Sequence, residues 1–360
     1  MTCNVRRPTI VLGAALLLMP ILAARAVEPM RKVTLAVGTT VINTGYPSLT
    51  LPLHLGYWTQ EGLDVDLEPV GASLQALQQM EAGNAQFAEV DAGVVVQANT
   101  RDDLAPRFVM SNGVIDWSIG VPPGSSIHSV SDLKGKTIGT FSLATGGLIY
   151  LRSYLRRNGL DPERDVQILP LGLGAQPVQA LRRGQVDALF YWAAAMASFG
   201  GAGLPLRFMH DPAWRRYPDF SLSVMQDTAV RDPDMVVGLA RGIAKAEIFA
   251  LANPDCALRI EEKAEGNAGD PGHAAQDLAI ETAQLDSARD AFALGGGQYR
   301  GRFDSASIAR LEALMLEAKL IDHTMPEAQL LVQIPNFSQR VNDFDPGPIK
   351  DAARACRMAG

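Results

Sequence analysis

The feature that most constrains how this chain can fold is an internal repeat of strands and helices. Short apolar strand patterns at 33–37 and 136–140 are each followed by a helical pattern that ends at a glycine and leads into a second strand. A further helix end, glycine and strand follow at 80–88 in the first copy and at 181–189 in the second. The copies lie roughly 100 residues apart, as in a duplicated structural unit. The repeat therefore predicts an α/β protein with two similar lobes.

Strands joined through helices pair in parallel by right-handed crossovers, and ligands bind beyond the carboxyl ends of such strands. We therefore expect the functional residues just after each strand. An apolar stretch at 117–121 is predicted to carry the chain out of the first lobe, and a strand around Val224 to return it. Two crossings of this kind would form a hinge between the lobes.

Beyond Asp232 the sequence changes to long helical patterns, which we expect to cover one of the lobes. The expected helices span residues 233–265, 273–294, 305–320 and 349–357. The predicted domain organisation is lobe I from residues 27–120 and 222–360, and lobe II from residues 121–221.

Residues 1–26 have the pattern of a secretory signal peptide. Arg6 and Arg7 form a basic region, an apolar segment follows at 10–23, and Ala-Arg-Ala at 24–26 matches a cleavage site. The apolar segment is too short to span a bilayer, which argues against the alternative of a membrane anchor. We expect a mature protein that begins at Val27 and is exported to the periplasm.

Composition excludes several classes of function. With 47% hydrophobic and 20% charged residues over 360 positions, the chain is expected to be globular. The net charge of −7 and the lack of a Lys/Arg-rich stretch interleaved with aromatic residues argue against a nucleic-acid partner. The sequence has no H-E-x-x-H, C-x-x-C, P-loop or G-x-S-x-G motif, and its five histidines are scattered. We expect no metal, no cofactor and no catalytic residues, although a triad assembled from distant positions stays open.

Five predicted strand ends supply the candidate ligand-binding residues. They are Thr39, Thr40, Tyr46, Asp91 and Asn112 in the first lobe, and Ser142, Thr145, Gly146, Tyr191 and Trp192 in the second.

The segment from Ser142 to Gly146 is rich in hydroxyl groups and precedes a helix, so it could hold an anion, although Ser142 or Thr145 could simply cap the helix. No strand-end loop contains Lys or Arg, which disfavours a multiply charged phosphate but leaves a sulfonate or an aromatic carboxylate open. Asp91 equally invites an amine or an aminopyrimidine, or caps the helix at 92–97. The residues do not choose among these ligands.

Tyr191 and Trp192 adjoin three small residues, Ala193 to Ala195, so an aromatic ring there could protrude and stack on a flat ligand. Side chains alternate along a strand, so only one of the two rings can point into the cleft. The alternative is that both belong to the core of the lobe.

Four segments carry a family resemblance: 56–65, 83–91, 132–139 and 184–188. In composition, order and spacing they resemble the solute-binding proteins of the sulfonate, taurine, nitrate and thiamine-pyrimidine group, the SsuA/THI5-like or NMT1 family. The resemblance implies a type II periplasmic binding protein fold, with a small organic solute clamped in a cleft between two lobes. It also implies a monomer that delivers its ligand to the permease and ATPase subunits of an ABC importer. A sulfonate, an aromatic carboxylate and a pyrimidine or thiamine precursor are the implied ligands.

The same resemblance leaves two other functions open. A few relatives are enzymes, among them a desulfinase with a cysteine in its cleft and pyrimidine-forming proteins with a cysteine-rich iron motif. Because the strand-end loops of this chain carry no cysteine, we expect a protein that is not an enzyme. The other alternative is a receptor that presents its ligand to a sensor kinase.

Two cysteines follow the signal sequence, Cys256 and Cys356. Export to an oxidising compartment with an even number of thiols predicts that they form a disulfide, with two free thiols as the alternative.

Overall fold

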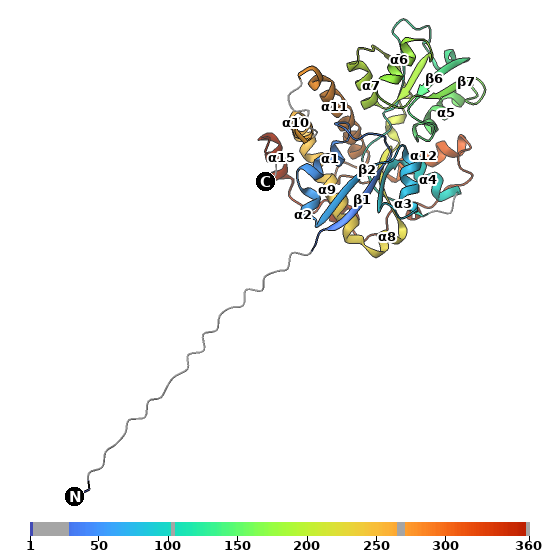
Figure 1. Ribbon diagram of the computed structural model, residues 1–360. Coiled ribbons are helices and arrows are strands. Elements are labelled where there is room, and N and C mark those ends of the chain that lie inside the picture. Colours follow the sequence, from blue (N-terminus) through green and yellow to red (C-terminus); the bar gives the residue numbers. More distant parts are fainter. Residues whose placement is uncertain (3–28, 102–104, 265–270, 358–360) are drawn as a thin grey trace.

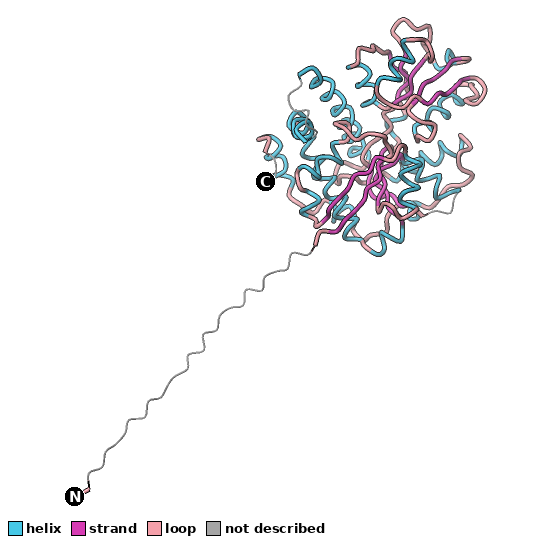
Figure 2. Tube along the Cα trace, viewed as in Figure 1, coloured by secondary structure: helices cyan, strands magenta, loops and turns pink. Residues whose placement is uncertain are grey.

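The computed structural model describes residues 1–2, 29–101, 105–264 and 271–357, which form two α/β lobes (Figure 1). The expected signal peptide lies outside these residues except for its first two positions. Among the described helices none is both long and apolar enough to cross a membrane. Figure 2 shows the strands of the two lobes as separate groups, each bordered by helices.

The first lobe contains a five-stranded sheet in the order β2-β1-β3-β10-β4. Its strands are β1 (Arg31–Val37), β2 (Leu63–Pro69), β3 (Phe87–Asp91), β4 (Pro106–Ser111) and β10 (Phe220–Met225). β1 is parallel to β2 and β3, whereas β10 is antiparallel to its neighbours β3 and β4.

Alternation along β1 distributes its side chains to two faces of the sheet. Leu35 and Val37 are buried in a cluster with Leu239 of α9 (Pro233–Ala252), while Ala36 is buried in another cluster with Leu77 of α3 (Ser73–Glu81). The sheet is therefore covered on both faces. The other helices along this part of the chain are α1 (Pro47–His54), α2 (Tyr57–Gln60) and α4 (Ala92–Arg101).

The second lobe repeats this arrangement, with a sheet in the order β7-β6-β8-β5-β9. Its strands are β5 (Ser118–Val121), β6 (Lys136–Thr140), β7 (Val166–Pro170), β8 (Ala188–Tyr191) and β9 (Arg207–Met209). Its helices are η1 (Val130–Leu133), α5 (Gly147–Arg157), α6 (Ala175–Arg182), α7 (Ala193–Gly201) and η2 (Trp214–Arg216). β6 is parallel to β7 and β8, and β5 is antiparallel to β8, as β10 is to β3 in the first lobe. The prediction of two similar α/β lobes is confirmed.

The chain crosses between the lobes at slightly different positions from those expected. The boundary at 120/121 cuts through β5, which lies wholly in the second sheet, and the boundary at 221/222 cuts through β10 of the first. The crossings precede these two strands, and a bridge between Val114 and Pro218 joins them. An apolar strand pattern does not reveal which sheet the strand joins, so the sequence placed both boundaries too late.

The C-terminal part also differs from its prediction. Instead of one helix over 233–265, α9 ends at Ala252 and α10 (Pro254–Ala264) follows. Pro254 has no N–H and disfavours the helical conformation of the residue before it, and Asn253 is extended, with φ −157°.

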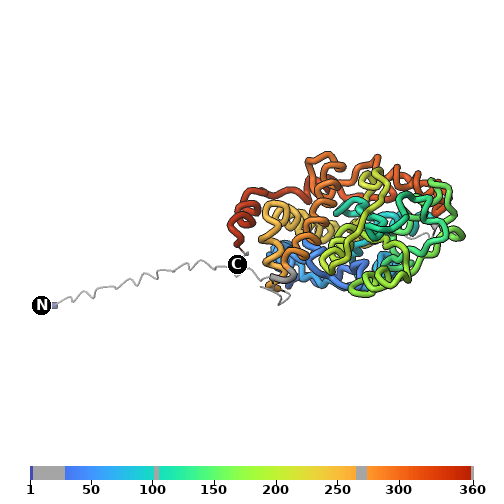
Figure 3. Tube along the Cα trace, turned by 90° about the horizontal axis from the view of Figure 1, so that it is seen from above, coloured from blue at the N-terminus to red at the C-terminus, as the bar shows by residue number. Residues whose placement is uncertain are grey.

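Two of the remaining helices contact both lobes rather than covering one. α11 (Pro271–Leu294) packs against α7 of the second lobe and α10 of the first, and α12 (Ser305–Glu317) packs against α4 and α5. In Figure 3 the orange and red segments run along one edge of the molecule and reach the green segments of the second lobe. The other helices are α8 (Gln226–Arg231), α13 (Glu327–Leu330), α14 (Phe337–Val341) and α15 (Pro346–Arg354).

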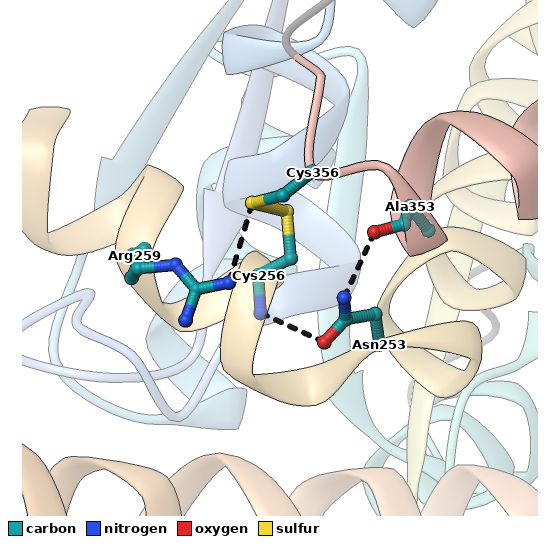
Figure 4. Close-up of a disulfide and its surroundings, with 5 residues drawn as sticks. All are labelled: Asn253, Cys256, Arg259, Ala353 and Cys356. Carbon is teal, nitrogen blue, oxygen red and sulfur yellow. Dashed lines mark hydrogen bonds between the residues drawn. A yellow bond between two sulfur atoms is a disulfide. The ribbon is translucent and has the colours of Figure 1, made fainter.

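A disulfide joins Cys256 in α10 to Cys356 just beyond α15, with Cα atoms 5.4 Å apart (Figure 4). Beside it, the Asn253 side chain donates a hydrogen bond to the carbonyl of Ala353 over 2.9 Å and accepts one from the N–H of Cys256 over 3.1 Å. The pairing expected from the sequence is confirmed, and it fastens the C-terminal helix to the first lobe.

Candidate functional site

A cavity lies between the lobes, where strand ends of both sheets meet. It is lined by Gly38, Tyr46, Ser73, Asp91, Asp116, Trp117, Phe141, Thr145, Trp192, Asp219, Phe220, Gln284 and Ser287. Its volume of about 50 Å³ holds a few water molecules, whereas pockets for organic ligands measure roughly 300–1,000 Å³. A second hollow of about 170 Å³ shares Tyr46 and Trp192 with it. An organic ligand therefore requires the lobes to move apart before they close on it.

Asp91 and Asp219 form a carboxyl pair on one wall of the cavity. Asp91 ends β3, and the antiparallel register pairs it with Phe220, which places Asp219 beside it. Asp91 Oδ1 accepts a hydrogen bond from the N–H of Gly93 over 2.8 Å, and Trp117 Nε1 donates to Asp219 Oδ2 over 3.3 Å. Burial raises the pKa of both carboxyls, and for Asp219 the neighbouring charge of Asp91 raises it further. The two side chains are hydrogen-bonded to each other, so they share a proton.

Asp116 is a third acidic residue of the lining and comes from the crossing segment before β5. It accepts a hydrogen bond over 3.3 Å from the N–H of Ala193, the first residue of α7. Burial raises its pKa to about 6, although this hydrogen bond and the charge of Arg215 act in the opposite direction. Arg215 itself is paired with Asp290 of α11. The described residues of the lining include no Lys or Arg to balance its three carboxyls.

Aromatic rings surround these acids. The ring of Trp192 lies 5.4 Å from that of Trp117 and 5.6 Å from that of Phe141, measured between centroids. Tyr46 and Phe220 form a second pair at 5.9 Å. The cavity thus combines flat apolar walls with acidic groups.

Tyr191 and Trp192 are neighbours in the chain, but their side chains lie in different surroundings. Tyr191 is fully buried, packs edge-on against Phe199 at 5.0 Å, and donates a hydrogen bond from its hydroxyl to the carbonyl of Gly172 over 2.8 Å. Trp192 lines the cavity. The expectation that one ring at most faces the cleft agrees with this arrangement, and Tyr191 belongs to the core.

The start of α5, expected to attract an anion, already has a carboxyl group beside it. A Cβ atom added at Gly146, the N-cap of α5, would lie 2.1 Å from Asp91 Cγ, so the Asp91 side chain lies directly against this residue. Ser142 accepts a hydrogen bond from the N–H of Ala144 and does not line the cavity, whereas Thr145 does. Ser142 therefore forms a local turn ahead of the helix and does not cap α5, whose N-cap Gly146 has no side-chain hydrogen bond, and Asp91 occupies the place foreseen for an anion.

Three of the expected residues lie around the cavity without lining it. Thr39 is buried and hydrogen-bonded to the Tyr46 side chain, and Thr40 is exposed. Asn112 is buried and donates a hydrogen bond over 2.8 Å to Glu89, a carboxyl whose pKa burial raises to about 8. These contacts support the wall behind Tyr46 and Asp91.

The prediction from strand ends did not include Asp116, Trp117, Asp219 or Phe220, although all four line the cavity. It looked only at the carboxyl ends of strands, but β5 and β10 run antiparallel to their neighbours, so their amino ends reach the cleft. The predicted crossings between the lobes could have indicated these residues, because the segments before β5 and β10 pass through the cleft. Gln284 and Ser287 of α11 lie outside the repeat, and no sequence pattern marks them.

The two lobes and the cavity between them define a class, the periplasmic binding protein fold. The family model described as NMT1/THI5 like matches residues 49–257, more than half of the chain, and the chain belongs to this family. The resemblance inferred from the sequence is thereby confirmed. No curated protein sequence matches the chain.

Solved structures share the fold at low sequence identity. A protein from Bordetella bronchiseptica RB50 has a TM-score of 0.66 and 20% identity, with 87% of this chain and 97% of that one covered. The periplasmic aliphatic sulphonate binding protein SsuA from Escherichia coli has a TM-score of 0.60 and 16% identity, with 84% and 92% covered. The desulfurization enzyme DSZB has a TM-score of 0.56 and 14% identity, with 86% and 99% covered. Binding proteins and an enzyme are thus both similar in fold.

Proposed function

We propose that this protein is the periplasmic solute-binding component of an ABC importer, and that its two lobes close over one small organic molecule. The observation that carries the proposal is the position of the cavity, which lies between the lobes and is lined from the strand ends of both. The hinge bridge of Val114 and Pro218 lets the lobes move as units about a fixed pair of crossings.

Two further features support an exported binding protein. The N-terminal sequence has the signal-peptide pattern, and the disulfide of Cys256 and Cys356 is of the kind that persists in an oxidising compartment. The partners would be the permease and ATPase subunits of the importer, and the protein would act as a monomer.

The alternative is an enzyme, because DSZB shares the fold. The described residues that line the cavity include no cysteine, histidine or lysine, and both cysteines of the mature chain are paired in the disulfide. A nucleophilic mechanism therefore has no thiol or amine to use at this position. A receptor for a sensor kinase would use the same cavity and differ only in its partner.

The test is ligand capture without chemical change. The mature protein is screened by thermal shift against sulfonates, aromatic carboxylates, amines and pyrimidines. Any ligand found is then recovered from the protein, and its molecular mass is measured by mass spectrometry. At one hundred times its dissociation constant a ligand should add ~2.7 kcal/mol to the free energy of unfolding. Recovery of an unaltered ligand supports the proposal. A ligand altered in the presence of the protein would support the enzyme instead.

A further inference from the structure

We propose that the ligand of this cleft is a small organic cation, whose protonated amine binds among the carboxyls of Asp91, Asp116 and Asp219 while its apolar body lies against the aromatic walls. The inference rests on the proposed function, because it names the class of solute that the lobes enclose. It selects one of the ligand classes that the sequence leaves open.

The first observation is the charge of the lining. Three carboxyls line one cavity, and among the residues that the structure describes no Lys or Arg side chain lines it. Arg215, whose charge acts on Asp116, is engaged by Asp290. Even with one proton shared between Asp91 and Asp219, the three carboxyls together present negative charge to a bound ligand. A sulfonate or carboxylate would be repelled there, whereas an ammonium group would be attracted.

The second observation is independent of the charge count and concerns the hydrogen bonds of Asp91. Its side chain is 3% exposed, and its Oδ2 atom is buried and accepts no hydrogen bond from an N–H group of the described residues. The group that faces it is the other acid, Asp219. The donor between these two acids is the one proton that they share, so the pair has fewer donors than acceptor oxygens. An ammonium group, which has three N–H donors and no acceptor, supplies what this wall lacks.

The aromatic residues fit the same class of ligand. Trp117 and Trp192 line the cavity, and a cation over the face of a tryptophan is attracted by the π-electrons of the ring. The rings also provide apolar contact for the uncharged part of the molecule.

A metal ion does not fit this position as well. Within the part of the chain that the structure describes, no group of three or more His, Cys, Asp or Glu side chains is arranged to hold one. The cavity combines three carboxyls with aromatic rings, which suits a cation that has one polar end and an apolar body. The structure therefore favours an organic amine over an inorganic ion.

The experiment compares three probes of one shape and different charge: benzylamine, benzyl alcohol and phenylmethanesulfonate. Binding to the mature protein is measured by isothermal titration calorimetry at pH 7.5 and low ionic strength, and a panel of larger aromatic and aliphatic amines and their sulfonate counterparts is screened by thermal shift. We expect amines to bind at least tenfold more tightly than their neutral and anionic counterparts throughout the panel.

The matched variants are Asp219→Asn, which keeps the size of the side chain, and Asp64→Asn on the exposed side of β2 as the control. The Asp219→Asn variant should lose at least tenfold in affinity for amines with its apo melting preserved, and the control should bind as the wild type does.

The outcomes separate the two proposals. If sulfonates bind and amines do not, or if Asp219→Asn leaves the affinity for amines unchanged, the cation inference is wrong while the solute-binding function stands. If no probe of either charge binds, both proposals fail.

Discussion

Replacing Tyr191 or Trp192 by alanine should damage two different properties of the protein, although the residues are neighbours in the chain. Tyr191 is fully buried among the side chains of the second lobe, and its hydroxyl is hydrogen-bonded to Gly172. Trp192 is only partly buried and lines the cavity between the lobes. The first residue should therefore matter for stability and the second for binding.

The magnitudes follow from these positions. Truncating a buried aromatic side chain to alanine typically costs ~3 to 5 kcal/mol, which for a chain of this length lowers the melting temperature by roughly 4–7 °C. The Tyr191→Phe variant removes only the hydrogen bond to Gly172 and should cost about 1 kcal/mol. The Trp192→Ala variant loses ~0.5 to 1.5 kcal/mol of aromatic contact with the ligand. This loss should weaken ligand binding by about 2- to 10-fold, in addition to the weakening caused by the smaller buried apolar area.

The assay is differential scanning fluorimetry of the apo proteins, followed by calorimetric titration of the ligand found in the screen. Tyr191→Ala should melt well below the wild type, and Trp192→Ala should keep most of its apo stability while it binds weakly. Normal binding by Trp192→Ala would place this ring outside the site. Unchanged melting of Tyr191→Ala would show that the tyrosine is not a core residue, and either result would refute the assignment of the end of β8.

Two further predictions concern stability. The double substitution Cys256→Ser and Cys356→Ser removes the disulfide and should lower the free energy of unfolding by up to ~4.7 kcal/mol, the chain-entropy value for a loop of 100 residues. Urea unfolding measures this difference, and equal midpoints for the variant and the wild type would contradict the prediction. Burial raises the pKa of Glu89 to about 8, so the folded protein favours its neutral form. The contribution of this group to the free energy of unfolding is fully present below pH 4.5 and is lost as the pH rises toward 8. The melting temperature should therefore fall less steeply between pH 5 and 8 for Glu89→Gln than for the wild type, because glutamine does not titrate and can still accept the hydrogen bond from Asn112. Equal slopes for the two proteins would argue against a titrating Glu89.

The internal repeat was sufficient to predict the lobes because each copy contains a complete strand-helix-strand pattern whose pairing is limited by general rules of connection. The same rules placed Asp91, Thr145 and Trp192 at strand ends, and all three line the cavity. Prediction from parallel strands alone could not find Asp219, because an antiparallel strand brings its other end to the same edge.

Other features depend on tertiary packing that no local pattern contains. The capping interpretation of Asp91 describes part of the structure, because one carboxyl oxygen accepts the N–H of Gly93 at the start of α4, while the hydrogen bond to Asp219 depends on the pairing of β10 with β3. The contribution of α11 to the cavity was not foreseeable either, since this helix lies outside the repeat and reaches the second lobe by packing against α7 and η2.

The contacts that hold the lobes together lead to a last prediction, on Gly146. A Cβ atom at this position would lie 2.1 Å from Asp91 Cγ, closer than real Cβ contacts, and one at Gly93 would lie 2.4 Å from Ile149 of the opposite lobe. The backbone of Gly146 is in the right-handed helical region, with φ −63°, so alanine is not strained there by itself. The clash in Gly146→Ala therefore exists only when the lobes are together.

Gly146→Ala should shift the protein toward an open form. Because Asp91 is held by the N–H of Gly93, it cannot move aside freely, and closure around a ligand should become less favourable by at least about 1.4 kcal/mol, a tenfold loss of affinity. Small-angle scattering should give a larger radius of gyration for the variant in the presence of ligand. Gly200→Ala in α7 is the matched control, since its added Cβ would have no atom within 4 Å. If Gly146→Ala bound ligand and closed as the control does, the contact between Gly146 and Asp91 would not be part of the closed state, and the predicted effect of this contact on closure would be wrong.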